Sequence, residues 1–300
     1  MIKYALEDMS NMRIKIIRTG GTIESVPSEN GLQPSRADFS FIKSDHEIKY
    51  AFPFTVDSSD LNGENVLNIA NIIKNDTDDA LVITHGTDTM CYTAAGLSFL
   101  LGNIGKPIIL TGSMYPLCDN NSDGYDNLQF AVDSAQSIKN SGVYIAMQGR
   151  LIHGAKAVKM HTHSVKAFAS ADGKDTPFPN ATGVGDNFNH NIKIEYITPF
   201  TTEISTDNAD AVLLCGYGAG NLPSRLKIPD NTHCYLLSQC QVGAVNSSLY
   251  STGVNAVNKG IIPLNMALPS AVMKLAIAYT YEKEIAKQIM QTEYCGEFLC

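Results

Sequence analysis

Two short segments rich in hydroxyl groups and glycine could carry chemistry in this chain. One is Thr19-Gly20-Gly21-Thr22 and the other is His85-Gly86-Thr87-Asp88-Thr89, and each follows an apolar run. Glycines at the end of a strand let the backbone approach a ligand closely. A threonine hydroxyl is nearly inert at neutral pH and needs a base or a positioned charge before it attacks a carbonyl carbon. The segments therefore predict either an activated nucleophile at Thr22 or a threonine that only caps a turn.

The residues around the second segment offer several acid-base groups. Asp88 suits a helix cap, and it also suits a site where backbone N–H groups hold an anion. His85 suits a general base, although a histidine at the end of a buried strand is commonly a hydrogen-bonded structural residue. Lys159 would accept a proton if burial lowered its pKa. His161 and His163 have no acidic or cysteine partner at ligand spacing, so we expect no metal and no other cofactor.

An alternation of strands and helices must position these segments. Up to about residue 150, short apolar runs alternate with amphipathic ones, which is typical of a parallel α/β domain. Strands are expected at 13–18, 80–84, 108–111, 143–147, 211–215 and 234–237, and helices at 65–74, 89–101, 124–138 and 272–290. Both threonine segments then lie at the carboxyl ends of strands, the edge where open α/β sheets bind ligands.

The composition indicates two domains with different sizes. A stretch at about 170–195 is rich in Gly, Asp, Asn and Pro, which marks a long loop. We expect an N-terminal, mainly parallel α/β domain over 1–182 that carries the catalytic threonines. A linker over 183–200 is expected to lead to a smaller C-terminal α/β domain over 201–300.

Charge and cysteine content exclude several classes of protein. The 300 residues have a formal net charge of -8 and no basic cluster, which argues against a nucleic-acid partner. No apolar run is long enough to cross a membrane. The seven cysteines form no CxxC pair, and residues 1–12 lack the apolar core of a secretory leader. We therefore expect a cytoplasmic enzyme without disulfides.

Five segments, taken in order, resemble the bacterial-type L-asparaginase family, in its cytoplasmic, type I branch. They are IIRTGGTIES, VDSSDLN, LVITHGTDTMCYTAAGLSFLL, GKPIILTGSMYPL and SDGYDNL. The resemblance runs from Ile14 to about Ser170 and returns at GYGAGNL and SQCQVGAVN. It implies an asparaginase-like fold and hydrolysis of a side-chain amide through an acyl-enzyme.

The resemblance also implies a role for individual residues. Thr22 matches the primary nucleophile, and a second constellation that positions or activates the nucleophile or water matches Thr87, Asp88 and Lys159. The α-carboxylate and α-amino groups of the substrate would be held by Ser58 and Asp60, with Ser59 nearby. Asn221 matches an asparagine that enters the site from a neighbouring subunit. A homodimer or homotetramer is therefore implied.

Two departures from the family pattern bear on activity. The loop after the first strand normally carries a tyrosine that hydrogen-bonds the nucleophile, and Leu32 aligns with that tyrosine. After IEYITP, family members usually have a further strand and helix, and here only TTEISTDNAD precedes the next strand. We therefore expect a shortened C-terminal domain that lacks one strand–helix unit.

Three functions fit these residues. The first is an L-asparaginase, with L-glutamine as a second candidate substrate, since one methylene changes discrimination by only about 1–3 kcal/mol. The alternative is a weakly active or inactive homologue that binds asparagine or aspartate as a sensor or regulatory subunit. The third is an amidotransferase subunit that supplies ammonia. It fits less well, because such subunits usually carry an extra N-terminal domain and only about a dozen residues precede the first expected strand.

Overall fold

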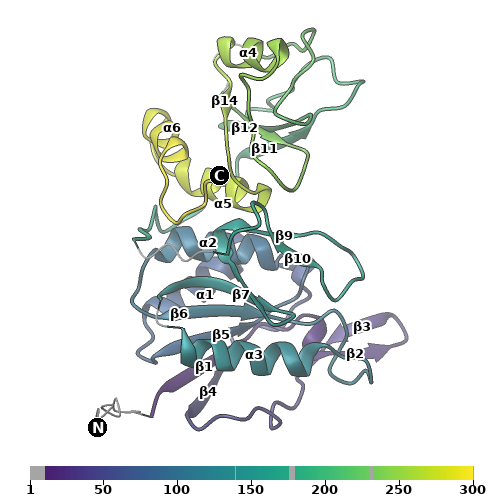
Figure 1. Ribbon diagram of the computed structural model, residues 1–300, viewed down its shortest axis with the longest axis vertical. Coiled ribbons are helices and arrows are strands. Elements are labelled where there is room, and N and C mark those ends of the chain that lie inside the picture. Colours follow the sequence, from purple (N-terminus) through teal and green to yellow (C-terminus); the bar gives the residue numbers. More distant parts are fainter. Residues whose placement is uncertain (1–10, 139, 176–179, 230–232, 300) are drawn as a thin grey trace, which may run out of the picture.

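A six-stranded sheet forms the larger of two lobes in the computed structural model, which describes residues 11–138, 140–175, 180–229 and 233–299 (Figure 1). Met1–Ser10, where we expected no secretory leader, and Cys300 lie outside the described residues. The strand order is β4 (Glu47–Ala51), β1 (Arg13–Arg18), β5 (Ala80–Thr84), β6 (Pro107–Thr111), β7 (Gly142–Met147) and β8 (Arg150–His153). All neighbouring pairs are parallel except β7–β8.

Helices cover both faces of this sheet, as the run of apolar residues in its strands requires. In β5, Leu81 and Ile83 pack with helices α1 (Gly63–Lys74) and α2 (Met90–Leu101). Ala80 and Val82 point to the opposite face, which α3 (Gly124–Ser137) covers. This alternation follows from the two-residue period of a strand. The predicted strands at 13–18 and 80–84 are confirmed to the residue.

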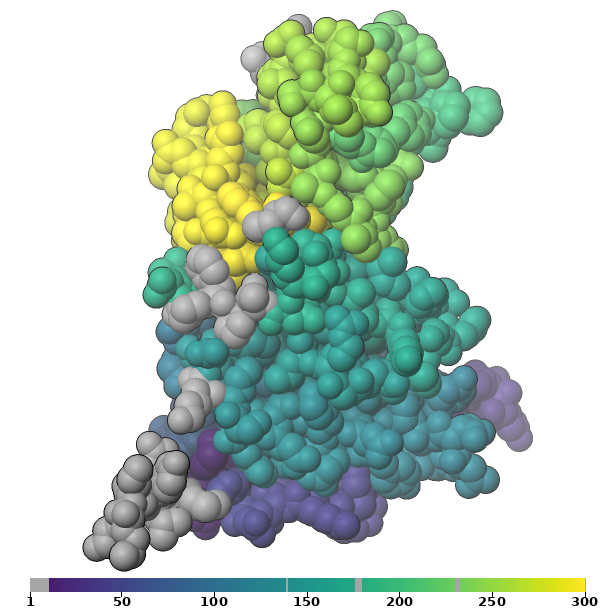
Figure 2. Space-filling view, in the orientation of Figure 1, coloured from purple at the N-terminus to yellow at the C-terminus, as the bar shows by residue number. Residues whose placement is uncertain are grey.

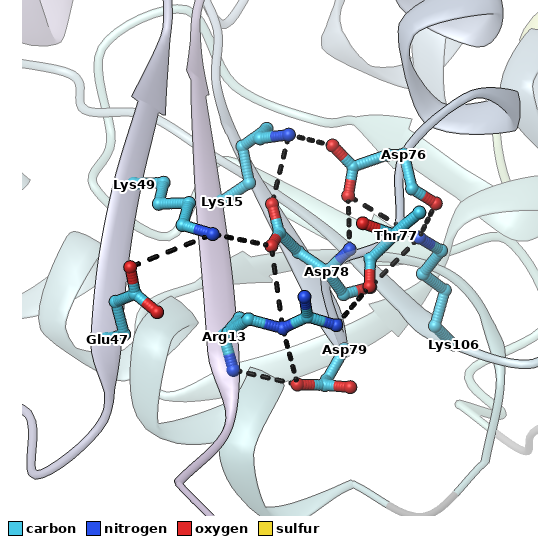
Figure 3. A network of polar contacts seen from close by, with 9 residues as sticks. All are labelled: Arg13, Lys15, Glu47, Lys49, Asp76, Thr77, Asp78, Asp79 and Lys106. Atoms are coloured by element: carbon cyan, nitrogen blue, oxygen red, sulfur yellow. Dashed lines mark hydrogen bonds and ion pairs between the residues drawn. The ribbon is translucent and has the colours of Figure 1, made fainter.

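A charged network closes the amino ends of the central strands, opposite the ends that carry the threonine segments. It contains four cations and four carboxylates, shown in Figure 3: Arg13, Lys15, Lys49 and Lys106 with Glu47, Asp76, Asp78 and Asp79. The side chains of Asp76 and Asp78 are buried, and a buried carboxylate needs such partners. Lys15 pairs with both of them. The network therefore ties the segment before β5 to β1 and β4.

A second sheet of four parallel strands forms the smaller lobe, which Figure 2 shows in green and yellow above the larger one. Its order is β11 (Ile192–Tyr196), β12 (Ala211–Gly216), β13 (Cys234–Ser238) and β14 (Ile262–Pro263). One face packs on α5 (Leu268–Ala278) and α6 (Lys283–Gln291), and α4 (Ser251–Asn258) lies on the other. The larger parallel sheet with a smaller parallel sheet is the fold class that we predicted.

Two details of the smaller lobe differ from expectation. The single helix expected over 272–290 is wrong, because the amides of Thr280 and Tyr281 bond back to Ile277 and Ala278 and end α5. The segment that we assigned as linker also contains a strand, β11, which pairs with β12 directly. The connection over 197–210 contains no helix and no strand, as expected for a chain that lacks one strand–helix unit after IEYITP.

The lobes meet where α5 lies across α2. At Gly96 of α2 the terminal methyl of Met273, from α5, occupies the space beside the glycine Cα. A short hairpin, β9 (Ala157–Lys159) with β10 (Phe168–Ser170), lies beside this junction (Figure 1). Within the described part of the chain, no helix has the length and apolar character needed to cross a membrane.

Candidate active site

The two threonine segments come together at the carboxyl ends of β1 and β5. Gly21 has a φ of 81°, and a side chain there would overlap the backbone of Gly86. Thr19 also reaches across, since its amide and its hydroxyl both donate to the carbonyl of Thr84, the hydroxyl at 2.7 Å. These contacts need glycine at both turns and a positive φ at the first, so the sequence dictates the close approach.

Thr22 opens a single 3-10 turn, Thr22–Glu24, directly after the glycine pair. Its side chain is partly exposed, whereas Ile23 and Glu24 are buried. The amide of Leu117, in the loop after β6, donates to the carbonyl of Ile23 at 3.3 Å. Thr22 is therefore a partly exposed residue on a turn whose neighbouring residues are buried.

The predicted second constellation is assembled in the structure. Lys159, the last residue of β9, donates from Nζ to Thr87 Oγ1 at 2.8 Å and to Asp88 Oδ1 at 2.6 Å. Asp88 does not cap α2: the helix begins after Thr89 and has no side-chain cap. The alternative interpretation of Asp88 as a helix cap is therefore wrong. A charged pair beside a partly buried hydroxyl can orient that hydroxyl or an adjacent water.

The DSSD segment also reaches this edge, although its members differ in exposure. Ser58 is buried, and its hydroxyl lies where a side chain on Gly86 would have to be. Its carbonyl accepts from Thr89 Oγ1 at 2.8 Å. Ser59 and Asp60 are exposed, and Ser59 donates to Asp57. Hydroxyls and backbone N–H groups of this kind are suited to bind a carboxylate.

His85 is a structural residue. Its ring is fully buried, with Nδ1 2.7 Å from the carbonyl of Gly86 and Nε2 2.9 Å from Thr93 Oγ1. Burial lowers its pKa to about 4, so the ring is neutral near pH 7. Both nitrogens are occupied by protein atoms, which leaves neither to serve as a base.

Leu32 lies on the exposed hairpin formed by β2 (Ser25–Ser28) and β3 (Gly31–Pro34), opposite Pro27. The hydroxyls of the hairpin residues Ser25 and Ser28 donate to the backbone carbonyls of Gly21 and Gly31. The contact that the hairpin makes with the Thr22 turn is therefore the hydrogen bond from Ser25 to the Gly21 carbonyl, and the hairpin contains no tyrosine.

Asn221 lies in the smaller lobe, whereas the other predicted residues lie in the larger one. It follows β12, and its Oδ1 accepts from Thr252 of α4 at 3.0 Å. Figure 1 places α4 at the far end of the smaller lobe and β2–β3 in the larger one. One chain alone therefore does not bring Asn221 to Thr22.

The smaller lobe nevertheless reaches the charged pair through a cavity. A cavity of about 230 Å³ is lined by Asp88 and Lys159 on one side and by Tyr196, Gln239 and other smaller-lobe residues on the other. Among the described residues, no group of three or more His, Cys, Asp or Glu side chains is arranged to hold a metal ion. The cavity lining offers one carboxylate, one amine, hydroxyls, two glutamine amides and the thiols of Cys91 and Cys240.

The sequence did not reveal the two charged residues that flank the Thr22 turn and pair with each other. Arg18 and Glu24 form a buried ion pair, and Glu24 also accepts from Thr84. The available signal was a pair of opposite charges, six positions apart, on either side of a glycine turn in an apolar stretch.

Comparisons with known proteins show which family the chain belongs to. The family model described as asparaginase, N-terminal, matches residues 13–181. L-asparaginase 1 of Escherichia coli strain K12 is 30% identical, over 96% of this chain and 98% of that protein. One component of the glutamyl-tRNA(Gln) amidotransferase of Pyrococcus abyssi is 31% identical, over 95% of this chain and 76% of that protein.

Solved structures that resemble this chain are also L-asparaginases. The thermostable L-asparaginase from Thermococcus kodakarensis has a TM-score of 0.83 at 26% identity, and the match covers 96% of this chain and 100% of that one. L-asparaginase I from Vibrio cholerae has a TM-score of 0.77 at 27% identity, with 97% and 100% covered. The chain therefore belongs to the L-asparaginase family, in its type I branch.

Proposed function

We propose that this protein hydrolyses the side-chain amide of L-asparagine to L-aspartate and ammonia, with Thr22 as the nucleophile. The observation that carries the proposal is the contact of Lys159 Nζ with Thr87 Oγ1 at 2.8 Å and Asp88 Oδ1 at 2.6 Å. This group lies on the turn that touches the Thr22 turn through Gly21 and Gly86. A hydroxyl nucleophile activated by a positioned group can hydrolyse an amide through an acyl-enzyme.

The reaction has two steps. The Thr22 oxygen attacks the amide carbon, the Thr22 proton passes to the departing nitrogen, and ammonia leaves with the electrons of the C–N bond. A water molecule then adds to the ester carbon, and the Thr22 oxygen leaves with a proton. Thr87, Asp88 and Lys159 orient the hydroxyl and then the water, and backbone N–H groups of the turns stabilise each oxyanion.

The remaining residues bind the substrate. Ser58 and Ser59 would bind its α-carboxylate, and Asp60 its α-amino group. Asn221 would enter from a neighbouring subunit of a homodimer or homotetramer, because its own chain holds it far from Thr22. We also propose a cytoplasmic location, supported by six unpaired cysteines among the described residues.

A second candidate is an amino-acid sensor, and the exposed Leu32 supports it. Loss of a positioned acid-base group typically costs about 100-fold to 10,000-fold in rate, which would leave a protein that binds without turning over.

Ammonia release and calorimetric binding, measured on the same protein with L-asparagine and with L-glutamine, separate the two candidates. The enzyme releases ammonia at a rate that saturates with the amide. A sensor binds L-asparagine or L-aspartate saturably and releases no ammonia above the blank, and that result would overturn the first candidate.

A further inference from the structure

A buried ion pair lies beneath the Thr22 turn. Arg18 is the last residue of β1, and Glu24 is the last residue of the 3-10 turn that begins at Thr22. Their exposed fractions are 8% and 2%. Arg18 Nε donates to Glu24 Oε2 at 2.9 Å, and Nη2 donates to the same oxygen. Burying two charges is costly, so a pair that serves only as packing could be replaced by apolar side chains at little cost to stability.

The second oxygen of Glu24 connects this pair to the other threonine segment. Thr84 Oγ1 donates to Glu24 Oε1 at 2.9 Å. Thr84 is the last residue of β5, and the turn that carries Thr87 and Asp88 follows it. A single carboxylate thus joins the end of β1, the Thr22 turn and the end of β5.

Arg18 is itself fixed, which makes it a rigid support for Glu24. Its Nη2 donates to the carbonyl of Ala37 at 2.7 Å. The guanidinium lies 3.9 Å from the ring centroid of Phe39 and 5.2 Å from that of Phe52, as in cation–π contacts. Both oxygens of Glu24 therefore accept hydrogen bonds from fixed donors, Oε2 from Arg18 and Oε1 from Thr84, which holds the carboxylate in one orientation.

We propose that Glu24 is a positioning residue that sets the distance between Thr22 and the Thr87, Asp88 and Lys159 group. The inference rests on the proposed function, because it assumes that Thr22 is the nucleophile. Rate depends steeply on such placement, and a displacement of about 1 Å can cost about 100-fold. The contacts of Glu24 matter more in this chain because hairpin β2–β3, which follows the Thr22 turn, carries Leu32 and no tyrosine hydroxyl.

Substitutions at Thr84 test the link with the least disturbance. Thr84→Val keeps the shape of the side chain and removes the donor, whereas Thr84→Ser keeps the donor. We expect Thr84→Val to lower kcat for L-asparagine about 10-fold or more, with KM within twofold, and Thr84→Ser to stay near wild type. Equal kcat values for Thr84→Val and wild type would overturn the proposal, as would an equal loss in both variants.

A double variant separates positioning from stability. Arg18→Met with Glu24→Met exchanges the pair for apolar side chains of similar length, so the melting temperature should stay close to that of wild type. The matched control exchanges another buried pair, Lys274→Met with Glu297→Met, which joins α5 to the C-terminal segment. We expect a loss of kcat of about 100-fold in the first double variant and unchanged kcat in the second.

The outcomes distinguish this inference from the function on which it rests. An inactive Thr22→Ala variant with a fully active Arg18→Met, Glu24→Met variant overturns the positioning role alone. An active Thr22→Ala variant, or a wild-type protein without turnover, overturns the function and the positioning role together. Equal losses in both double variants show a general effect of removing buried pairs and also overturn the positioning role.

Discussion

The ammonium of Lys159 donates a hydrogen bond to the hydroxyl of Thr87 over 2.8 Å, although the two residues are 72 positions apart in the chain. The contact joins the hairpin β9–β10 to the turn after β5, and Asp88 on the same turn neutralises the lysine at 2.6 Å. Two elements that are distant in the sequence thus form one polar cluster of Thr87, Asp88 and Lys159.

Removing this amine should abolish turnover and spare the fold. Lys159→Met keeps the aliphatic stem and deletes the charge, so we expect kcat for L-asparagine to fall about 100-fold to 10,000-fold. Binding of L-aspartate by calorimetry should persist. Lys166→Met is the matched control, since Lys166 is an exposed lysine on the same hairpin loop. Similar kcat values for the two variants would contradict the assigned role.

Restoring a phenol to the hairpin should raise the rate. Leu32 is 49% exposed on β3, so a larger side chain meets no steric barrier. We expect Leu32→Tyr to raise kcat about 100-fold if the family's tyrosine contact forms, and Leu32→Phe, which lacks the hydroxyl, to give no gain. Steady-state ammonia release measures both. An equal gain in the two variants would assign the effect to ring packing.

Subunit mixing should show whether Asn221 acts across an interface. Thr22→Ala and Asn221→Ala are each expected to be impaired. In a mixed dimer, one of the two sites combines an intact Thr22 with an intact Asn221. Random exchange of equal amounts should therefore recover about a quarter of wild-type activity. No recovery after verified exchange would place Asn221 outside the site.

Acid stability should depend on the network at the amino ends of the strands. Burial raises the pKa of Asp78, but the hydrogen bonds and charges of Lys15 and Lys49 hold it below its ordinary value of 3.8. A carboxyl with a lowered folded pKa stabilises the fold above its unfolded pKa. That stabilisation is lost as the pH falls through the folded pKa.

We therefore expect Asp78→Asn to lower the free energy of unfolding by about 2 kcal/mol at pH 7. The difference from wild type should shrink as the pH falls below about 4. Urea unfolding across this range measures it, with Asp45→Asn, at an exposed site, as the control. A difference that does not change with pH would show that the effect of the substitution is not electrostatic.

The sequence predicted the core of the fold because strands such as β5 and β6 are buried on both faces and read as unbroken apolar runs. It did not predict the break between α5 and α6. The segment 272–290 reads as one amphipathic helix, whereas the structure ends α5 at Ala278, and the Tyr279 hydroxyl that follows contacts His233 and Tyr235, more than 40 positions away. β11 was also missed, because its partly exposed, mixed residues resemble a loop until β12 pairs with them.

Some features of the candidate site could likewise be predicted from the sequence, and others could not. The glycine turns could be predicted locally, because only glycine permits Gly21 and Gly86 to touch. The partnership of Thr87 with Lys159 followed from the family resemblance, since no local pattern connects residues so far apart. The Glu24 link to Thr84 could not be predicted for the same reason, since long-range side-chain hydrogen bonds leave no periodic signal in a sequence.

Ammonia release by wild type, Thr22→Ser and Thr22→Ala shows whether Thr22 is the nucleophile. We expect turnover of L-asparagine by wild type, reduced turnover by Thr22→Ser, and none by Thr22→Ala, with unchanged circular dichroism and retained L-aspartate binding. Turnover by Thr22→Ala at the wild-type rate would contradict the account.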